Sequence, residues 1–270
     1  MAQRSFVIQS ATIHGVEALP VLVEVVISSG IPSFSIVGMA DATIMESRER
    51  VKAALRASGF VMPTDKIVVN LAPGALRKTG SGFDLPIALG ILAATGQINP
   101  EWVVGALVVG ELSLSGAVRA NVGMLAYQKC ALEHGWDIVT GIAERGFFSL
   151  EGVTCHILER LAHIRTGSFV AGRSYVSEPL NESLDYSEVL GHEAAKRALQ
   201  VAAAGNHGVL MVGPPGSGKT MLAQRFVTIL PDLNKVQKIE AALVHSVAGE
   251  DISSLLSGRR PFRSPHHSAT

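Results

Sequence analysis

Cysteine is scarce in this sequence, since Cys130 and Cys155 are the only two in 270 residues. Neither stands in a cluster with the spacing of metal ligands, and the pair does not indicate a disulfide framework. We expect both to be reduced thiols, Cys130 on a helix and Cys155 in a strand. The scarcity argues against a disulfide-stapled domain and against a cysteine-ligated metal centre.

Long apolar runs are missing as well. The best candidate, residues 85–94, is far shorter than the roughly 20 residues that a membrane-spanning helix needs, and it contains Pro86. The N-terminus, from Met1 to Phe6, has no hydrophobic core of the signal-peptide kind. We therefore predict a soluble, cytoplasmic protein with no membrane partner.

The sequence also lacks an excess of charge of either sign. Lysine plus arginine and aspartate plus glutamate both number 23, which gives a formal net charge of zero. This balance argues against a protein that bulk positive charge holds on nucleic acid. It leaves room for a few basic loops with that role inside a ring-shaped assembly.

Hydrophobic residues are abundant at 47 %, and 270 residues are enough for two domains. Short β-branched runs bounded by turn residues predict strands, and 3.6-residue periodicity predicts helices. The expected strands span 6–13, 21–27, 33–37, 66–71, 137–140, 153–158 and 208–212, with a strand or hairpin at 103–114. The expected helices span 42–57, 84–94, 122–133, 192–204, 221–227 and 234–248, with a further helix starting at 159–164.

This order of elements predicts an α/β fold class in two parts. We place an N-terminal α+β domain at residues 1–165 and a linker at 166–186, where Gly, Ser, Glu and Pro replace the periodic pattern. The second domain then occupies residues 187–270, and its last residues, 259–270, read as loop. Asp41 is the expected N-cap of the first helix, whose charged residues are expected to form a solvated face: Glu46, Arg48, Glu49, Arg50 and Lys52.

One motif in the second part carries the strongest chemical signal. A short apolar run at 208–212 leads into a stretch that fits G-x-x-x-x-G-K-[ST], the phosphate-binding loop of nucleoside triphosphatases, and a helical pattern follows. A chance glycine-rich turn is the alternative, but spacing, strand and helix agree with one another. The predicted nucleotide-binding residues are Gly213, Pro214, Pro215, Gly216, Ser217, Gly218, Lys219, Thr220 and Met221.

The residue types of this loop explain the prediction. Three glycines allow the backbone N–H groups to curl around phosphate oxygens, and the following helix presents its positive dipole end to the same anion. Lys219 is expected to reach the β- and γ-phosphates, and Thr220 to offer its hydroxyl to Mg²⁺. ATP and Mg²⁺ are therefore the expected cofactors.

A second feature of such ATPases is missing from the sequence. Hydrolysis also needs a strand that ends in acidic residues, which hold Mg²⁺ and activate water. The 50 residues after Thr220 contain no apolar run ending in Asp-Glu, and Glu250-Asp251 is a poor match. We expect a nucleotide domain that is cut short, binds nucleotide weakly and hydrolyses little by itself.

The motifs taken together resemble the magnesium-chelatase-like AAA+ ATPases of the YifB/ComM type. In the second part they are SEVLGHEAAKRAL at 187–199, the phosphate loop itself and RPFRSPHHS at 260–268. In the first part they include VGMAD at 37–41, ESRERV at 46–51, NLAP at 70–73 and FDLPIA at 83–88. The resemblance covers essentially the whole chain, with His192 standing where the family usually has Gln.

The resemblance implies a homo-hexameric ATPase that acts on DNA, as in competence proteins that drive branch migration during transformation. Family members continue beyond the phosphate loop, through a Mg²⁺-binding strand, sensors and a lid. Two alternatives stay open: a noncatalytic binding or assembly module, and a subunit of a metal chelatase. We favour the DNA role because the chelatase motor subunit is expected to lack the N-terminal domain.

The N-terminal domain resembles the proteolytic domain of Lon proteases, which use a serine nucleophile and a lysine base. The position of the nucleophile falls on Gly82, one residue from Ser81, and the position of the base falls on Leu125, one helical turn from Lys129. Glycine cannot attack a substrate and leucine cannot accept a proton. We therefore predict no protease activity, and a role for this domain in assembly or DNA contact.

The remaining polar residues carry weaker signals. His245, His266 and His267 have no acidic or cysteine partner with metal-ligand spacing, so polar loops are the better interpretation. Arg77 and Lys78 are equally compatible with phosphate contact and with a solvated surface, and aromatic residues do not alternate with basic ones in the manner that stacks single-stranded bases. Three arginines of the C-terminal loop are candidates for contact with DNA phosphates or with a neighbouring subunit's nucleotide, and a solvated loop is the alternative: Arg259, Arg260 and Arg263.

Overall fold

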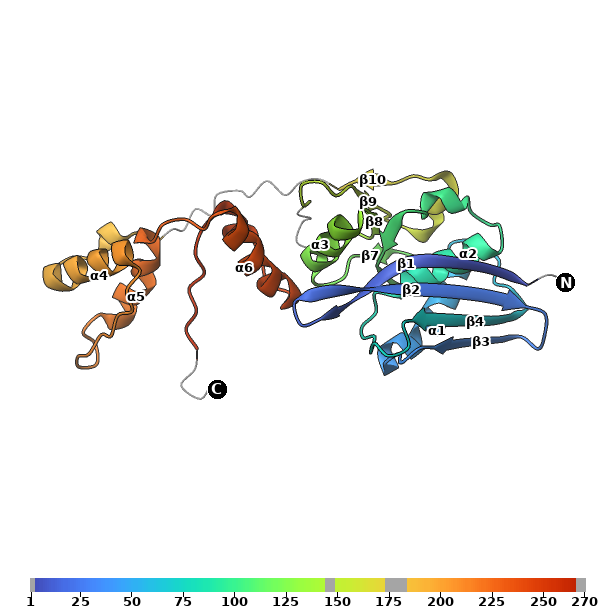
Figure 1. Cartoon of the computed structure of the whole chain (residues 1–270), viewed down its shortest axis with the longest axis horizontal. Helices are drawn as coiled ribbons and strands as arrows, with labels where there is room; N and C mark the ends of the chain where they lie inside the picture. Colours follow the sequence, from blue (N-terminus) through green and yellow to red (C-terminus); the bar gives the residue numbers. More distant parts are fainter. Residues whose placement is uncertain (1–2, 144–148, 173–183, 266–270) are drawn as a thin grey trace. The chain divides into compact units, whose positions relative to one another are not determined.

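The computed structural model describes residues 3–143, 149–172 and 184–265 (Figure 1). The chain divides into two compact units, residues 1–175 with 243–250 and residues 176–242 with 251–270. Within the described residues, no helix combines the length and the apolar character that crossing a membrane requires.

The first unit is built on one mixed eight-stranded sheet, in the order β10-β9-β8-β5-β1-β2-β4-β3. Neighbouring strands run antiparallel at β1–β2, β2–β4 and β9–β10 and parallel elsewhere. The strands are β1 (Arg4–His14), β2 (Glu17–Ser28), β3 (Ser33–Val37), β4 (Lys66–Ala72), β5 (Ala106–Val108), β8 (Asp137–Thr140), β9 (Cys155–Ile157) and β10 (Val170–Ala171). A separate pair joins β6 (Glu111–Leu112) to β7 (Val118–Arg119). The expected α/β fold class is confirmed.

Helices cover the two faces of this sheet, α1 (Ala42–Ala57) and α2 (Asp84–Ala94) on one and α3 (Met124–His134) on the other. Side chains alternate along each strand, so neighbours in sequence enter different cores. On β8, Val139 joins the α1/α2 core while Ile138 joins the α3 core. The same unit contains the 3₁₀ turns η1 (Pro100–Trp102) and η2 (Leu161–Thr166).

Helix α1 begins and ends where the sequence predicts. The Asp41 carboxylate accepts the N–H of Ile44, 2.9 Å away, which satisfies one of the free donors at the helix N-terminus. The prediction of a fully solvated charged face is wrong in one respect. Arg50 turns inward and donates to the buried carboxylate of Asp84, the first residue of α2, whereas Glu46 and Glu49 stay exposed.

The end of the first unit differs from the sequence prediction. The helix expected to start at 159–164 is the 3₁₀ turn η2, and β10 lies inside the stretch expected to be a linker, where it pairs with β9. The sheet therefore continues past residue 165. The rest of the expected linker up to residue 183 lies outside the described residues, and the domain limits stay predictions.

The second unit contains η3 (Tyr186–Glu188), α4 (Glu193–Gly205), α5 (Lys219–Phe226), η4 (Val227–Ile229) and α7 (Ser253–Ser257), and α6 (Lys235–Val247) begins in it. Its small core gathers Tyr186, Val189, Leu199 and Leu222. The strand predicted at 208–212 is absent, and Leu210 and Val212 are both 88 % exposed. A strand needs hydrogen-bonded neighbours, and the described part of this unit contains no other strand to supply them.

Candidate phosphate-binding site

The glycine loop leads into helix α5 in the way that the motif predicts. Gly216 and Gly218 adopt left-handed backbone angles, with φ of +79° and +77°. Gly218 is the N-cap of α5, and its carbonyl accepts the N–H of Leu222 at 2.9 Å. Only glycine takes such angles without strain, so the loop can turn sharply and expose the first N–H groups of α5 to an anion.

The side chain of Lys219 folds back over the loop. Its ammonium donates to the carbonyl oxygens of Gly213 at 2.9 Å and Pro214 at 2.7 Å, and to the hydroxyl of Ser217 at 3.2 Å. These three acceptors hold the positive charge over the loop. A phosphate that entered the loop would meet this ammonium and would offer it anionic oxygens in place of the neutral carbonyl and hydroxyl acceptors.

Thr220, the predicted Mg²⁺ ligand, is exposed at the first turn of α5, and Met221 beside it is half-buried. The loop backbone, Lys219 and the Thr220 hydroxyl therefore come together at one helix N-terminus. A hydroxyl and phosphate oxygens are suitable ligands for Mg²⁺, so these residues fit nucleotide with its metal. The assignment of the nine loop residues to nucleotide binding stays a prediction.

His192 lies beside the same loop. In the sequence, this residue stood out only because the family usually has Gln at its position. A Cβ added at Gly218 would stand 3.5 Å from Nε2 of His192. His192 itself has a φ of +57° and precedes α4, yet its side chain does not cap that helix. The imidazole ring therefore borders the glycine loop.

Two contacts fix α5 within the second unit. Leu222 is 3 % exposed in the small core, and Arg225 donates through Nε and Nη2 to Oε2 of Glu188, at 3.1 and 2.8 Å. The Tyr186 hydroxyl in turn donates to the Lys196 carbonyl at 2.8 Å and joins η3 to α4. The helix that carries Lys219 is therefore anchored at its far end, while its N-terminus remains open.

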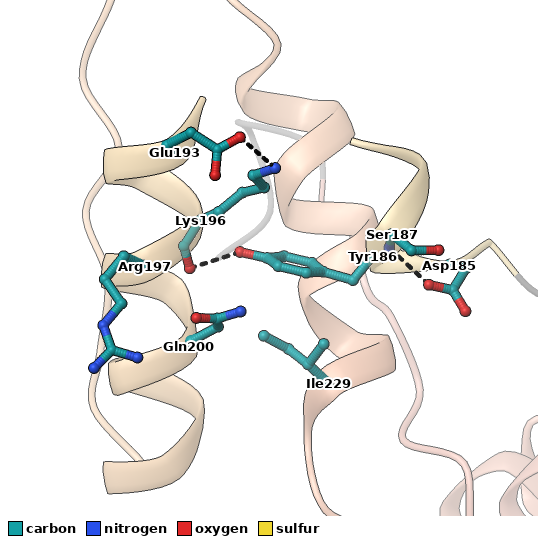
Figure 2. A pocket seen from close by; sticks show the side chains of 8 residues that line it. All are labelled: Asp185, Tyr186, Ser187, Glu193, Lys196, Arg197, Gln200 and Ile229. Atoms are coloured by element: carbon teal, nitrogen blue, oxygen red, sulfur yellow. Dashed lines mark hydrogen bonds and ion pairs between the residues drawn. The ribbon is translucent and has the colours of Figure 1, made fainter. Parts of the chain in front are cut away.

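A cavity of about 540 Å³ lies beside α4 rather than at the glycine loop. Figure 2 shows Gln200 of α4 facing Ile229 of η4, with the Tyr186 ring nearby. The Lys196 ammonium in its wall is already paired with the Glu193 carboxylate at 2.8 Å. None of the nine predicted nucleotide-binding residues lines this cavity, so the cavity does not support their assignment to nucleotide binding.

The positions that correspond to a protease dyad hold no such dyad. Gly82 is buried, and a Cβ there would lie 3.1 Å from Val109 Cγ2 and 3.2 Å from the Asn121 amide, so no larger side chain fits without a shift. Leu125 is buried in α3. A serine at the first position would therefore require Val109 or Asn121 to move by a few tenths of an ångström.

The neighbouring candidates have other partners. The Ser81 hydroxyl donates to Oε2 of Glu111 at 2.7 Å, and the Lys129 ammonium is 3.8 Å from a carboxylate oxygen of Glu133 on the same helix. Neither makes the serine–lysine contact that a Lon-type mechanism needs.

Lys78 is fully buried, which contradicts both sequence interpretations of this residue. Its ammonium donates to the Gly38 carbonyl at 3.0 Å and to the Pro73 carbonyl, and burial lowers the pKa of the amine. The side chain therefore joins the ends of β3 and β4 and is not available to phosphate. Periodicity gave no signal for this burial, because Lys78 lies in a polar loop.

The described residues contain no group of three His, Cys, Asp or Glu side chains able to hold a metal ion. His245 contacts Glu250 at 2.8 Å, and His266 and His267 lie outside the described residues. Cys130 and Cys155 are free and buried, and burial raises the pKa of each thiol to about 11, so both stay protonated at neutral pH.

Of the three arginines in the C-terminal loop, Arg260 donates from Nε to the Pro231 carbonyl at 2.7 Å. The Arg259 amide N–H donates to Ser254. These contacts tie the start of the loop to its own unit. They do not test the predicted contact of these arginines with DNA or a neighbouring subunit.

Comparison with known proteins places this geometry in a family. A family model described as subunit ChlI of Mg-chelatase matches residues 23–140, and one described as magnesium chelatase, subunit ChlI, matches residues 185–270. We favoured the DNA role because the chelatase subunit was expected to lack the N-terminal domain. The first match bears a chelatase-subunit description and lies in that domain, so the presence of the domain does not distinguish the two functions. The glycine loop and α5 lie within the second match.

Full-length relatives give the same result. The chain is 40 % identical over 266 residues to YifB of Salmonella typhimurium, which covers 95 % of this chain and 52 % of YifB. It is 36 % identical over 275 residues to the competence protein ComM of Haemophilus influenzae, covering 98 % of this chain and 54 % of ComM. The chain thus spans about half the length of these curated relatives, and it belongs to the magnesium-chelatase-like family of the YifB/ComM type.

Proposed function

We propose that the chain forms the N-terminal domain and phosphate-binding loop of a cytoplasmic AAA+ ATPase that assembles as a homo-hexamer and acts on DNA. The observation that carries this proposal is the arrangement at α5. Left-handed Gly216 and Gly218, the open helix N-terminus and the Lys219 ammonium together make a site for a polyphosphate. The resemblance to ComM supports DNA as the substrate.

In this function the residues of the chain bind and orient the nucleotide. The loop N–H groups and Lys219 hold the phosphates, and the Thr220 hydroxyl holds Mg²⁺, which when bound neutralises charge on the transferred phosphate. The described residues contain no acidic strand end to orient the attacking water. We therefore propose nucleotide binding for residues 1–270 and assign hydrolysis to the whole protein.

Nucleotide binding by the chain, with and without Mg²⁺, tests the proposal directly. We expect Lys219→Ala to weaken ATP binding at least tenfold, because one charge-assisted contact is worth about 1.5–3 kcal/mol. Lys235→Ala is the matched control, since Lys235 is exposed at the start of α6 in the same unit. Equal affinities for both variants and the parent would refute a functional loop, and brisk turnover would refute the view that the chain lacks a catalytic acid.

A metal-chelatase subunit is the second candidate, favoured by the descriptions of both matching family models. The two functions share the nucleotide site and differ in what stimulates it. Turnover of the full-length protein that rises with branched DNA supports the first. Turnover that is insensitive to DNA but coupled to Mg²⁺ insertion into a porphyrin supports the second.

A further inference from the structure

The imidazole of His192 packs against the glycine loop at the residue where α5 begins. A Cβ added at Gly218, the N-cap of α5, would lie 3.5 Å from Nε2 of His192, which is ordinary van der Waals contact. His192 is itself the N-cap of α4, so the N-termini of two helices meet beside this ring. Both helices therefore have their positive dipole ends next to the loop.

Helix capping does not account for this histidine. The His192 side chain makes no capping hydrogen bond to α4, although it occupies the capping position. Its backbone has a φ of +57°, a left-handed conformation that costs free energy in any residue other than glycine. Backbone strain of this kind is typical of functional sites.

The ring nitrogens of His192 are open to a ligand. The residue is exposed, and its imidazole makes no hydrogen bond or ion pair with any residue in the described part of the chain. A neutral imidazole has one donor and one acceptor nitrogen, and an imidazolium has two donors. The side chain can therefore donate to an anion that enters the loop.

The charged side chains of the two helices leave His192 without a carboxylate partner. Five such side chains belong to these helices: Glu193, Lys196 and Arg197 of α4 and Lys219 and Arg225 of α5. The only carboxylate among them, that of Glu193, is paired with the Lys196 ammonium at 2.8 Å. Arg225 is paired with Glu188, and the Lys219 ammonium donates to neutral oxygens of the loop. Neither helix thus supplies a free negative charge to an imidazolium.

We infer that His192 is a further nucleotide-binding residue, whose protonated imidazole donates a hydrogen bond to a phosphate oxygen in the glycine loop. The inference rests on the proposed function, because it adds one side chain to the site that the loop and Lys219 form. A hydrogen bond between an imidazolium and a phosphate is charge-assisted, and such bonds are shorter and stronger than those between neutral groups.

The contact makes nucleotide affinity depend on pH. Histidine is the side chain whose charge ordinarily changes between pH 5 and pH 8. An imidazolium attracts phosphate, whereas a neutral ring offers only an uncharged donor. The contribution of His192 to binding should therefore be largest at pH 6 and should disappear towards pH 8.

Titrations of the chain with ATP at pH 6 and pH 8 test this contact. We expect His192→Gln to weaken ATP binding about tenfold at pH 6 and by less than about twofold at pH 8, because glutamine donates a hydrogen bond but carries no charge. Comparing parent and variant at the same pH cancels the protonation of ATP itself. An equal loss at both pH values, or no loss at either, would overturn the inference.

His207→Gln is the matched control, since His207 is an exposed histidine just beyond the opposite end of α4. It should leave the ATP affinity unchanged at both pH values. A pH-dependent loss in His207→Gln equal to that in His192→Gln would show that the effect does not come from the glycine loop.

A permanent cation separates the effect of charge from loss of structure. His192→Lys should bind ATP about tenfold more tightly than His192→Gln at pH 8, because an ammonium group stays protonated there. Equal affinities of the two variants, with both folded by circular dichroism, would contradict a contact between charges.

Two further ligands distinguish the phosphates from the base. The pH-dependent loss in His192→Gln should recur with inorganic tripolyphosphate, which has charge but no base, and should be absent with adenosine. A loss seen with adenosine and not with tripolyphosphate would put His192 at the base and overturn the assignment to phosphate.

Lys219→Ala separates this inference from the proposed function. If Lys219→Ala weakens ATP binding at pH 6 while His192→Gln does not, the glycine loop binds nucleotide and only the assignment of His192 fails. If neither substitution changes the affinity, the loop is not a nucleotide site, and the proposed function fails together with the inference.

Discussion

Arg50 and Asp84 form an ion pair between α1 and α2 in which the carboxylate is completely buried. Arg50 Nε lies 2.7 Å from Oδ2 and Nη2 lies 3.0 Å from Oδ1, and the Leu112 amide also donates to Oδ2 at 3.2 Å. Hydrogen bonding to Asp84 raises the pKa of Arg50. The pair thus joins the two helices that cover one face of the sheet.

We predict that Asp84→Asn strongly destabilises the first unit. The substitution removes the charge of the buried carboxylate while Arg50 keeps the exposed Glu46 carboxylate 3.5 Å away, so the expected cost is that of a lost charge-assisted hydrogen bond, about 1.5–3 kcal/mol. The exposed pair of Glu49 and Lys52, 2.9 Å apart, supplies the control, and Glu49→Gln should cost less than about 1 kcal/mol. Urea unfolding followed by circular dichroism measures both, and equal costs would mean that the Asp84 pair contributes no more than a surface contact.

Lys78 should make the stability of the first unit depend on alkaline pH. Burial lowers the pKa of the folded protein's amine below its ordinary value of 10.5, so between these two pKa values the unfolded chain binds more protons. Stability rises with pH wherever the unfolded state binds more protons. We therefore expect the contribution of Lys78 to the free energy of unfolding to increase as the pH rises towards 10.5.

Lys78→Met should remove this pH-dependent gain, and urea unfolding at several pH values up to 10 measures it. Lys129→Met is the control, because Lys129 is 40 % exposed and should leave the slope unchanged. A slope that is the same in the parent and in both variants would show that Lys78 is not the group responsible.

Restoring a serine at the position of the protease nucleophile should fail. In Gly82→Ser the new Cβ would press on Val109 and Asn121, and we expect a loss of about 1–3 kcal/mol from overpacking. Gly74→Ser is the matched control, since nothing lies within 4 Å of a Cβ there. A stable Gly82→Ser variant that reacts with a fluorophosphonate probe would contradict this prediction.

The sequence predicted much of the first unit because its elements carry local signals. Helix α2 matches the predicted 84–94, and α1 matches 42–57 because Asp41 supplies a cap and Gly59 follows its end. Tertiary contacts were not visible in the same way. Lys78 and Arg50 have the sequence pattern of surface residues. Only the fold shows that Lys78 donates to buried backbone carbonyls and that Arg50 donates to the buried Asp84 carboxylate.

The second unit shows the opposite error. Residues 208–212 have a strong strand pattern, but β-propensity expresses the fit of side chains to a neighbouring strand, and the described residues provide none here. We predict that the backbone amides of Val209, Leu210 and Val212 exchange hydrogen far faster than those of β4, because they lack ladder hydrogen bonds. Hydrogen exchange followed by mass spectrometry measures this, and protection equal to that of β4 would contradict it.

Of the predicted nucleotide-binding residues, Gly218 offers the sharpest test of backbone geometry. An alanine there must adopt a φ near +77°, which costs about 1–2 kcal/mol, and its Cβ would meet the His192 ring at 3.5 Å. The free loop can relax out of this conformation, so nucleotide binding has to restore it. We therefore expect Gly218→Ala to weaken ATP binding about tenfold in a titration, whereas Gly208→Ala, with open space and no left-handed angle, should bind like the parent. If both variants bound ATP equally well, the left-handed turn at Gly218 would be irrelevant to the site, and the phosphate would have to be held elsewhere.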